Sequence, residues 1–202
     1  MSGIIAQNVG RHTGLMKAPE GGGAWTFISK QTASSSATIS FTSGIDSTYK
    51  EYLFTFKNIH PASDGVYLQF QGNASGGSGY NETITSSYFI AYHFEDGSAA
   101  ALSYSAGGDL AQGTGFQRLS QNVGNDNDQC ASGYLHLFEP SSTTYIKNFI
   151  GRTTTIADDN GPADSLAGGY FNTTSAIDEI QFKMSSGNID SGVIKMYGLS
   201  KS

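Results

Sequence analysis

From residue 25 onward, apolar and small polar side chains alternate along the chain with a period of two. In residues 37–42, for example, Ile39 and Phe41 face one way and the intervening Ser and Thr residues face the other. A period of two is the spacing of side chains on one face of a β-strand, whereas a helix repeats about every 3.6 residues. The alternation therefore predicts a chain of strands, each with one apolar face turned toward a core.

Repetition of this pattern predicts about ten strands, separated by loops rich in Gly, Asn, Asp and Ser. We expect strands at residues 25–30, 37–42, 49–59, 66–71, 87–94, 116–119, 133–138, 144–155, 169–171, 177–185 and 192–199. The main loops are expected at residues 72–83, 95–115, 122–129 and 157–166. Two connections, at residues 58–64 and 186–188, are short enough to join neighbouring strands as antiparallel hairpins.

The composition agrees with strands and excludes several other classes of protein. Charged residues make up 14 % of the chain, compared with about 25 % in typical soluble proteins, and aromatic residues make up 12 %. Such a sequence lacks the helix formers of a helical bundle, and its aromatic content and net charge of −6 do not fit a disordered chain. The acidic balance offers no basic surface for nucleic acid, and no window approaches the roughly 20 apolar residues needed for membrane insertion.

Many short alternating strands with long polar loops are typical of an all-β fold. We predict a two-sheet antiparallel β-sandwich, jelly-roll-like, at residues 25–202. Residues 1–24 lack the alternation and end in the triple glycine 21–23, so we expect an extended N-terminal arm there. Cys130 is the only cysteine, which leaves the sandwich without an internal disulfide, and the start of the chain does not match a signal peptide. A single cysteine fits folding in a reducing cytoplasm, or a core large enough to need no disulfide.

The strand positions that face away from the predicted core carry Thr, Ser and Gln rather than charged residues. Surfaces with so few charges are often covered by a neighbouring subunit, which would make the protein a homo-oligomer. The alternative is that Ser/Thr surfaces are simply neutral and soluble. The arm supports the first interpretation, because its apolar residues need a partner that covers them. These residues are Ile4, Ile5, Leu15 and Met16.

No motif in the sequence indicates a reaction or a cofactor. The four histidines lack the spacing of a zinc site, and there is no nucleophile elbow, P-loop or dinucleotide fingerprint. The best metal candidates are Asp158, Asp159 and Asp164, because calcium prefers several oxygen ligands. The EF-hand spacing fails, however, and Asp beside Asn and Gly is equally typical of a solvated turn. We therefore expect no catalytic residues, no cofactor and no metal.

Tyrosines in or beside the glycine-rich loops are the candidates for ligand contact. They are Tyr80, Tyr104 and Tyr170. An exposed tyrosine ring can stack on a sugar face, and glycine lets a ligand approach the backbone. The alternative interpretation is that these rings pack under their own loops or against a neighbouring subunit.

Several segments resemble a family of small virion appendage proteins of tailed bacteriophages, of the kind found in marine phages. The segments are Tyr52–Pro61 with Gly65–Phe70, the closing Ser191–Gly198, and the opening Ser2–Asn8 with Thr13–Lys17. The family comprises short tail fibres and capsid-decoration proteins. The resemblance implies a non-enzymatic structural protein of the virion, usually trimeric, with a jelly-roll-like sandwich and an N-terminal arm that attaches to the particle. It carries no catalytic residues.

Together these observations lead to one main hypothesis and two alternatives. The main one is a short tail fibre or receptor-binding appendage, assembled as a homotrimer in the bacterial host cytoplasm. It would bind other virion proteins through its arm and display the sandwich toward a host surface glycan. A capsid-decoration or head-fibre protein would have the same fold, and the absence of a fibrous shaft in so short a chain raises this alternative to near parity. A glycan-cleaving enzyme of the tailspike type is the alternative from another class, and it would need carboxylates that converge from different strands.

Overall fold

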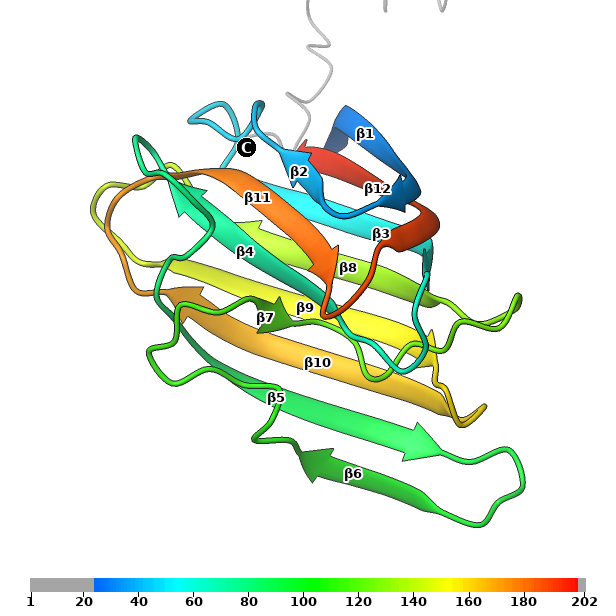
Figure 1. The fold of residues 1–202 in the computed structure, drawn as a ribbon. Helices are drawn as coiled ribbons and strands as arrows, with labels where there is room; N and C mark the ends of the chain where they lie inside the picture. The colour runs from blue at the N-terminus through cyan, green and yellow to red at the C-terminus, as the bar shows by residue number, and fades with distance from the viewer. Residues whose placement is uncertain (1–23, 200–202) are drawn as a thin grey trace, which may run out of the picture.

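The computed structural model describes residues 24–199, which form twelve strands and no helix (Figure 1). The strands make two antiparallel sheets that pack face to face, so the prediction of an all-β, two-sheet sandwich is confirmed. In this part of the chain there is accordingly no helix that could cross a membrane. The predicted arm, with Ile4, Ile5, Leu15 and Met16, lies outside the described residues.

The large sheet has eight strands and the small sheet has four. In spatial order, the large sheet consists of β1 (Trp25–Ser36), β12 (Ile189–Leu199), β3 (Glu51–Pro61), β8 (Ala131–Phe138), β9 (Lys147–Ile156), β10 (Pro162–Phe171), β5 (Ile84–His93) and β6 (Ala100–Tyr104). The small sheet consists of β2 (Ile39–Phe41), β11 (Ile177–Met184), β4 (Leu68–Ala74) and β7 (Gln117–Arg118).

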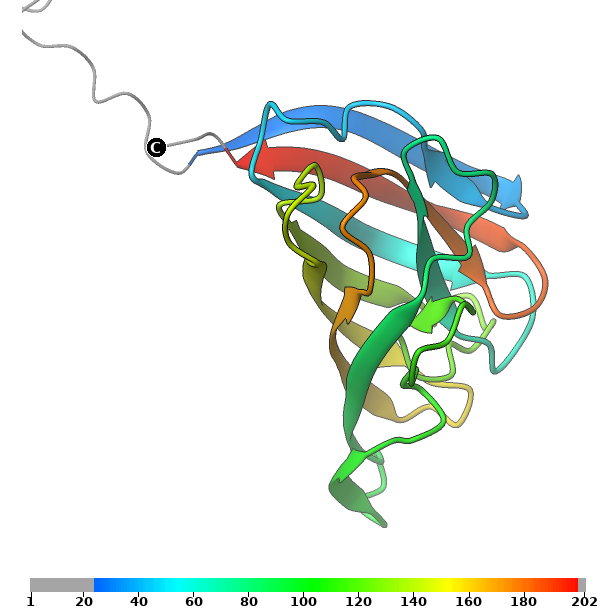
Figure 2. The ribbon, with the colours of Figure 1, turned by 90° about the vertical axis from the view of Figure 1, so that its left-hand side faces the viewer.

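Eight of these strands follow the order of a jelly roll. When β5, β6, β9 and β10 are set aside, β1-β12-β3-β8 faces β2-β11-β4-β7. The first strand thus pairs with the last, and most consecutive strands lie in opposite sheets, which is the arrangement of a jelly roll. The other four strands extend the large sheet, and β6 forms its far edge beyond the small sheet (Figure 2).

Both expected hairpins are wrong, because each connection crosses from one sheet to the other. β3 pairs with β12 and β8 rather than with β4, and β11 pairs with β2 and β4 rather than with β12. The physical reason lies in the core. Phe54 of β3 and Phe182 of β11 turn toward each other from opposite sheets, with ring centroids 5.5 Å apart. Strands that share a core in this way lie across from each other and not side by side.

Two segments that were expected to be loops contain strands. β6 lies within residues 95–115, and β10 begins at Pro162, within residues 157–166. β10 has a ladder on each side, with β9 and with β5, so its backbone groups are satisfied despite turn-forming residues. Pro162 is tolerated because it is the first residue of the strand.

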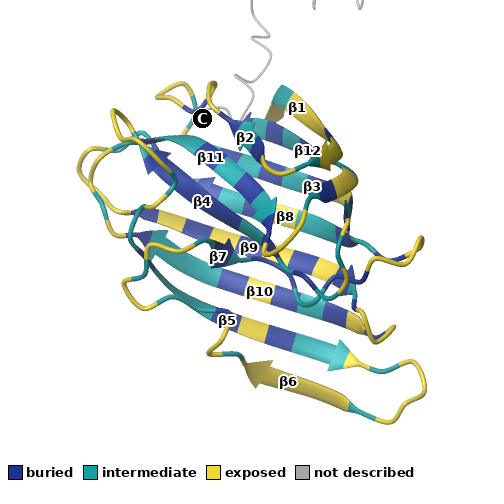
Figure 3. Ribbon diagram, in the orientation of Figure 1, coloured by how far each residue is buried: buried dark blue, intermediate teal, exposed yellow. Residues whose placement is uncertain are grey.

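The core beneath the small sheet is aromatic. Phe56 of β3 packs on Phe182 with centroids 5.2 Å apart, and Phe70 of β4 packs on Phe149 of β9 at 5.0 Å. These are edge-to-face contacts, a geometry that aromatic rings favour. Buried positions accordingly concentrate where the two sheets overlap (Figure 3).

Candidate functional site

Exposed apolar side chains gather on the side of the large sheet that faces away from the small sheet, which we call the outer face. Ten large apolar side chains are exposed among residues 24–199, and eight of them lie on this sheet. The alternation of buried and exposed positions, together with the strand register, places all eight on the outer face. They are Trp25, Phe27, Phe89, Leu102, Tyr104, Tyr134, Ile150 and Leu166. Exposed apolar side chains that cluster in this way are typical of an interaction surface.

The strand register arranges part of this surface in a continuous row. Tyr104 lies opposite Phe89, and Phe89 lies opposite Leu166. Leu166 in turn lies opposite Arg152, which lies opposite Tyr134. Side chains directly opposite on antiparallel strands have Cβ atoms about 4.5–5.5 Å apart, so the members of the row contact one another.

An open hollow of about 400 Å³ lies along this row. Its apolar wall includes Phe89, Leu102 and Leu166, and Arg152 and Asp164 complete the lining. The Arg152 guanidinium donates from Nε to Asp164 Oδ1 at 3.0 Å and from Nη2 to Oδ2 at 2.6 Å. The Asp164 carboxylate raises the pKa of the Arg152 guanidinium, and the two opposite charges balance each other. The hollow therefore presents apolar surface with little net charge.

Aromatic contacts also order the outer face near the β1 edge. Trp25 packs edge-on against His136 with centroids 5.4 Å apart, and Phe138 lies 4.1 Å from the same imidazole. His136 Nε2 lies 2.8 Å from Glu51 Oε2, so these two polar side chains are partners of each other. His136 is thus held between rings and a carboxylate, as expected of a side chain on a sheet face.

β9 and β10 bury Phe149 and Phe171 in the core, but at some positions they cover a polar side chain and expose an apolar one. Leu166 is 43 % exposed, while the adjacent Ser165 is fully buried. Ile150 is likewise exposed, while Thr153 is fully buried and donates from Oγ1 to the Leu119 carbonyl at 2.7 Å. Burial in a single copy does not account for this inversion, because it exposes the apolar side chain and covers the polar one. It fits a face that is covered by another molecule.

The outer face of the small sheet is polar instead. Its outward positions on β4 and β11 carry Gln69, Gln71, Asn73, Glu179, Gln181 and Lys183. Several are satisfied within the chain: Gln181 Nε2 donates to Ser40 Oγ at 2.9 Å, and Asn73 Nδ2 lies 3.3 Å from Glu179 Oε2. The small sheet's outer face is therefore polar and largely satisfied within the chain, and Gln71 and Asn73 are buried beneath neighbouring segments.

The three predicted tyrosines do not form one site. Tyr80 lies on the small-sheet side, where its hydroxyl donates to Glu179 Oε2 at 2.9 Å; burial and this carboxylate raise the pKa of the Tyr80 phenol. Tyr104 is in β6, where it packs on Phe89 at 5.3 Å and donates to Asp109. Tyr170 is half-buried on the outer face of β10. Tyr104 and Tyr170 thus share the outer face, and both lie in strands rather than loops.

The three aspartates named as metal candidates are also separated. Asp164 is paired with Arg152 on the outer face, whereas Asp158 and Asp159 lie in the β9–β10 loop. Asp159 Oδ1 accepts from the Gly161 N–H at 3.1 Å, which is the geometry of an Asp turn. Residues 24–199 contain no group of three or more His, Cys, Asp or Glu side chains that could hold a metal ion.

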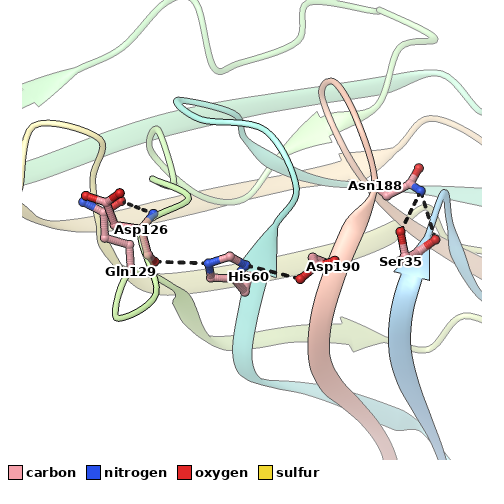
Figure 4. A network of polar contacts seen from close by, with 6 residues as sticks. All are labelled: Ser35, His60, Asp126, Gln129, Asn188 and Asp190. Atoms are coloured by element: carbon pink, nitrogen blue, oxygen red, sulfur yellow. Dashed lines mark hydrogen bonds and ion pairs between the residues drawn. The ribbon is translucent and has the colours of Figure 1, made fainter.

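Loops at the end of the sandwich opposite the chain ends are bound to each other. His60 Nε2 contacts the Asp126 carbonyl at 3.1 Å, and its Nδ1 lies 4.0 Å from Asp190 Oδ2 (Figure 4). Nearby, Gln129 Oε1 accepts from the Asp126 N–H at 3.0 Å. Through Nε2, His60 therefore ties β3 to the β7–β8 loop, and Asp190 of β12 lies beside its Nδ1.

The two ends of the described chain lie side by side. Trp25, the first residue of β1, pairs with Leu199, the last residue of β12. The opposite end of the sandwich carries the β3–β4, β5–β6, β7–β8 and β9–β10 loops, which contain acidic residues and neither Lys nor Arg. The molecule thus has a corner where the chain ends and an acidic loop end.

Comparisons of the chain with protein-family models, with curated proteins and with solved structures gave no match. The candidate site accordingly rests on the geometry of this chain alone.

Reasoning from the sequence missed most of the outer face. Of its eight exposed apolar side chains, only Tyr104 was among the predicted site residues. The available signal was consecutive apolar residues within a predicted strand, as at Phe149 and Ile150. Because neighbours on a strand point to opposite faces, one member of such a pair has to lie outside the core.

Proposed function

We propose that the protein is a non-enzymatic structural subunit of a bacteriophage virion, a short tail-fibre or receptor-binding appendage. In this proposal it assembles as a homotrimer through the outer face of the large sheet. The observation that carries the proposal is the row of exposed apolar side chains on that face, from Tyr104 through Phe89 and Leu166 to Tyr134. Burying such a row against another copy removes apolar surface from water at little electrostatic cost.

The arrangement of the chain ends supports attachment through the arm. An arm that precedes Trp25 leaves from the corner where β1 starts and β12 ends, away from the acidic loop end. Anchored at that corner, the loop end would point outward, toward a host surface glycan. The segments that resemble phage appendages form β3, β12 and the start of β4, which belong to the jelly-roll part of the sandwich.

Sedimentation equilibrium tests the assembly. We expect a species of three times the chain mass, or a multiple of that mass, at micromolar concentration. A protein that stays monomeric at that concentration contradicts the proposed trimer.

Electron microscopy of virions with an antibody against the sandwich tests where on the particle the protein lies. Label at the tail supports the appendage, label over the capsid supports the decoration protein instead, and unlabelled particles contradict both.

Deletion of residues 1–20 should abolish incorporation into particles while leaving the isolated sandwich folded. Incorporation at the normal level would overturn the role of the arm.

A polysaccharide assay tests the non-enzymatic part of the proposal. The proposal predicts binding to host glycan without release of reducing ends. Sustained release would replace it with the tailspike-type alternative.

A further inference from the structure

The large sheet ends in β6, which lacks the features that protect the other three edge strands from pairing. β1 carries a bulge between Phe27 and Ser29 and an exposed Lys30, while β2 and β7 have only three and two residues. β6 has the sequence AALSY, with no charge and no proline, and all five residues are exposed. Bulges, charges and shortness are the usual means of preventing edge-to-edge pairing. β6 therefore presents an open edge.

Hydrogen bonds at the two ends of β6 identify which of its backbone groups are free. The Ser105 N–H donates to a β5 carbonyl at 2.9 Å, and the Ala99 carbonyl accepts from the N–H of the residue that follows β5 at 2.9 Å. Alternate residues of an antiparallel strand direct their backbone groups to the same side, so the odd-numbered residues face β5. The N–H and C=O groups of Ala100, Leu102 and Tyr104 consequently point to the open edge.

β6 also gains little from burial. The small sheet does not reach it (Figure 2), and Leu102 is 77 % exposed. Its only partner strand among residues 24–199 is β5. A strand with one partner and no covered face has little to stabilise it, which favours a second partner on its free side.

We propose that β6 pairs antiparallel with β6 of a second copy, about a two-fold axis at Leu102, so that two large sheets become one. The strand is self-complementary in this register. Leu102 lies opposite its counterpart, and Ala100 lies opposite Tyr104, a small side chain against a large one. Each of these pairs exchanges two N–H···O bonds, and the strand itself carries no charge that would repel its copy.

This contact is separate from the proposed trimer and does not rest on the virion function. A two-fold contact between β6 strands does not close a trimer. It joins one assembly to the next, or two monomers if no trimer forms. In either case, blocking β6 should halve the mass of the species in solution.

Two variants at one position separate backbone pairing from side-chain contact. Ala100→Pro removes an N–H that faces the open edge and leaves the β5 ladder intact, whereas Ala100→Ser keeps the N–H and changes the side chain. Ala100 is not among the eight apolar side chains of the outer face, so the proposed trimer surface is unaltered in both variants. By sedimentation, we expect Ala100→Pro to have half the mass of the wild type and Ala100→Ser to match the wild type. Equal masses for wild type and Ala100→Pro, or halving by both variants, would overturn the pairing.

Cysteine cross-linking tests the register even if Ala100→Pro fails to fold. In a Cys130→Ser background, Leu102→Cys places two thiols on directly opposite residues, whose Cα atoms are about 5.5 Å apart and within reach of a disulfide. Ala100→Cys is the matched control, because its counterpart lies about 14 Å away along the strand. Oxidation should give covalent dimers of the first variant alone. No dimer at position 102, or equal dimers at both positions, contradicts the proposal.

Discussion

The outer faces of the two sheets differ in a way that separates folding from assembly. On the small sheet, outward side chains are amides and charged groups that bond within the chain, as Gln181 does with Ser40. On the large sheet, the outward positions include exposed side chains such as Leu166, Ile150 and Phe89. Arg152 and Asp164 neutralise each other beside these side chains, and other charges such as Lys57 and Lys195 lie toward the β1 edge. The first face is satisfied by its own hydrogen bonds, and the second offers apolar side chains to another protein surface.

The side chains that face the core also differ between the part of the large sheet under the small sheet and the strands β9 and β10. Where the small sheet covers the large one, the core is built from phenylalanines such as Phe54, Phe70 and Phe182. Under β9 and β10 the inner positions include Thr153 and Ser165. These positions bury a small polar side chain, while exposed side chains such as Leu166 and Ile150 lie on the other face of the same strands. Exposed apolar side chains at such positions suit association more than the stability of one copy.

The largest expected effect is on association, and it comes from placing a charge on the outer face of the large sheet. Leu166→Lys places a second cation opposite Arg152 in the apolar row. We expect association to weaken by at least about 30-fold, or about 2 kcal/mol, the size of an interface hot spot. Gln181→Lys, on the small outer face, is the matched control and should leave the mass distribution unchanged. Sedimentation equilibrium measures association in both variants. An equal loss of association in Leu166→Lys and Gln181→Lys would contradict the difference between the two outer faces.

Substitutions at Ser165 and Leu166, which face opposite sides of β10, should have the next largest effect. This effect is on the stability of the fold. Ser165→Leu overpacks a fully buried position and should destabilise the fold by about 1–3 kcal/mol. Leu166→Ser changes an exposed position and should alter monomer stability by less than about 0.5 kcal/mol. Urea unfolding of the dissociated protein measures both values. A greater loss of stability for Leu166→Ser than for Ser165→Leu would contradict the placement of Ser165 in the core and Leu166 on the outer face.

A smaller effect is expected on the small-sheet side. Tyr80→Phe removes the hydrogen bond to Glu179 from a partly exposed site, so we expect a loss of about 0.5–1 kcal/mol in stability and no change in mass. Thermal unfolding and sedimentation on the same sample check the two outcomes. A change in mass without a change in stability would assign this face to assembly instead.

The smallest expected effect is on the pH dependence of stability, and it concerns Lys147 on the inner side of β9. Its side chain is fully buried, with Nζ donating to the carbonyls of Tyr145 at 2.7 Å and Thr173 at 3.2 Å. Burial lowers the pKa of this ammonium group in the folded state. The unfolded chain therefore binds more protons, and the free energy of unfolding should rise with pH on approach to the ordinary lysine pKa.

Lys147→Met removes this titration and nearly preserves side-chain volume. The rise with pH should be present in the wild type and absent from the variant, as measured by urea unfolding across the alkaline range. Parallel curves for the two proteins would show that Lys147 does not contribute to the pH dependence.

The sequence was enough to predict the fold class but not the pairing of strands. Alternation identified β3, β8 and β12, and the two-sheet sandwich followed from the number of strands. The connection after Pro61 is equally short in a hairpin and in a crossing between sheets, and only the shared core distinguishes them. β10 was missed because its ladders with β5 and β9 override the turn-forming residues at its start.

The candidate site was less predictable for a related reason. Alternation states that Ser165 and Leu166 face opposite ways, but it does not state which of them faces the core. Hydrophobicity alone would bury Leu166, whereas the structure buries Ser165. That choice depends on the register with β9 and with β5, and β5 is distant in the chain.

Trp25 provides the most direct test of the claim that the large outer face is covered in the assembly. It is the only tryptophan, it lies on this face, and it is 38 % exposed in the single copy. Acrylamide quenching of its fluorescence should fall as the protein associates with rising concentration, and should stay high at all concentrations in Leu166→Lys. An assembled wild type whose Trp25 is quenched as readily as in that dissociated variant would contradict the account.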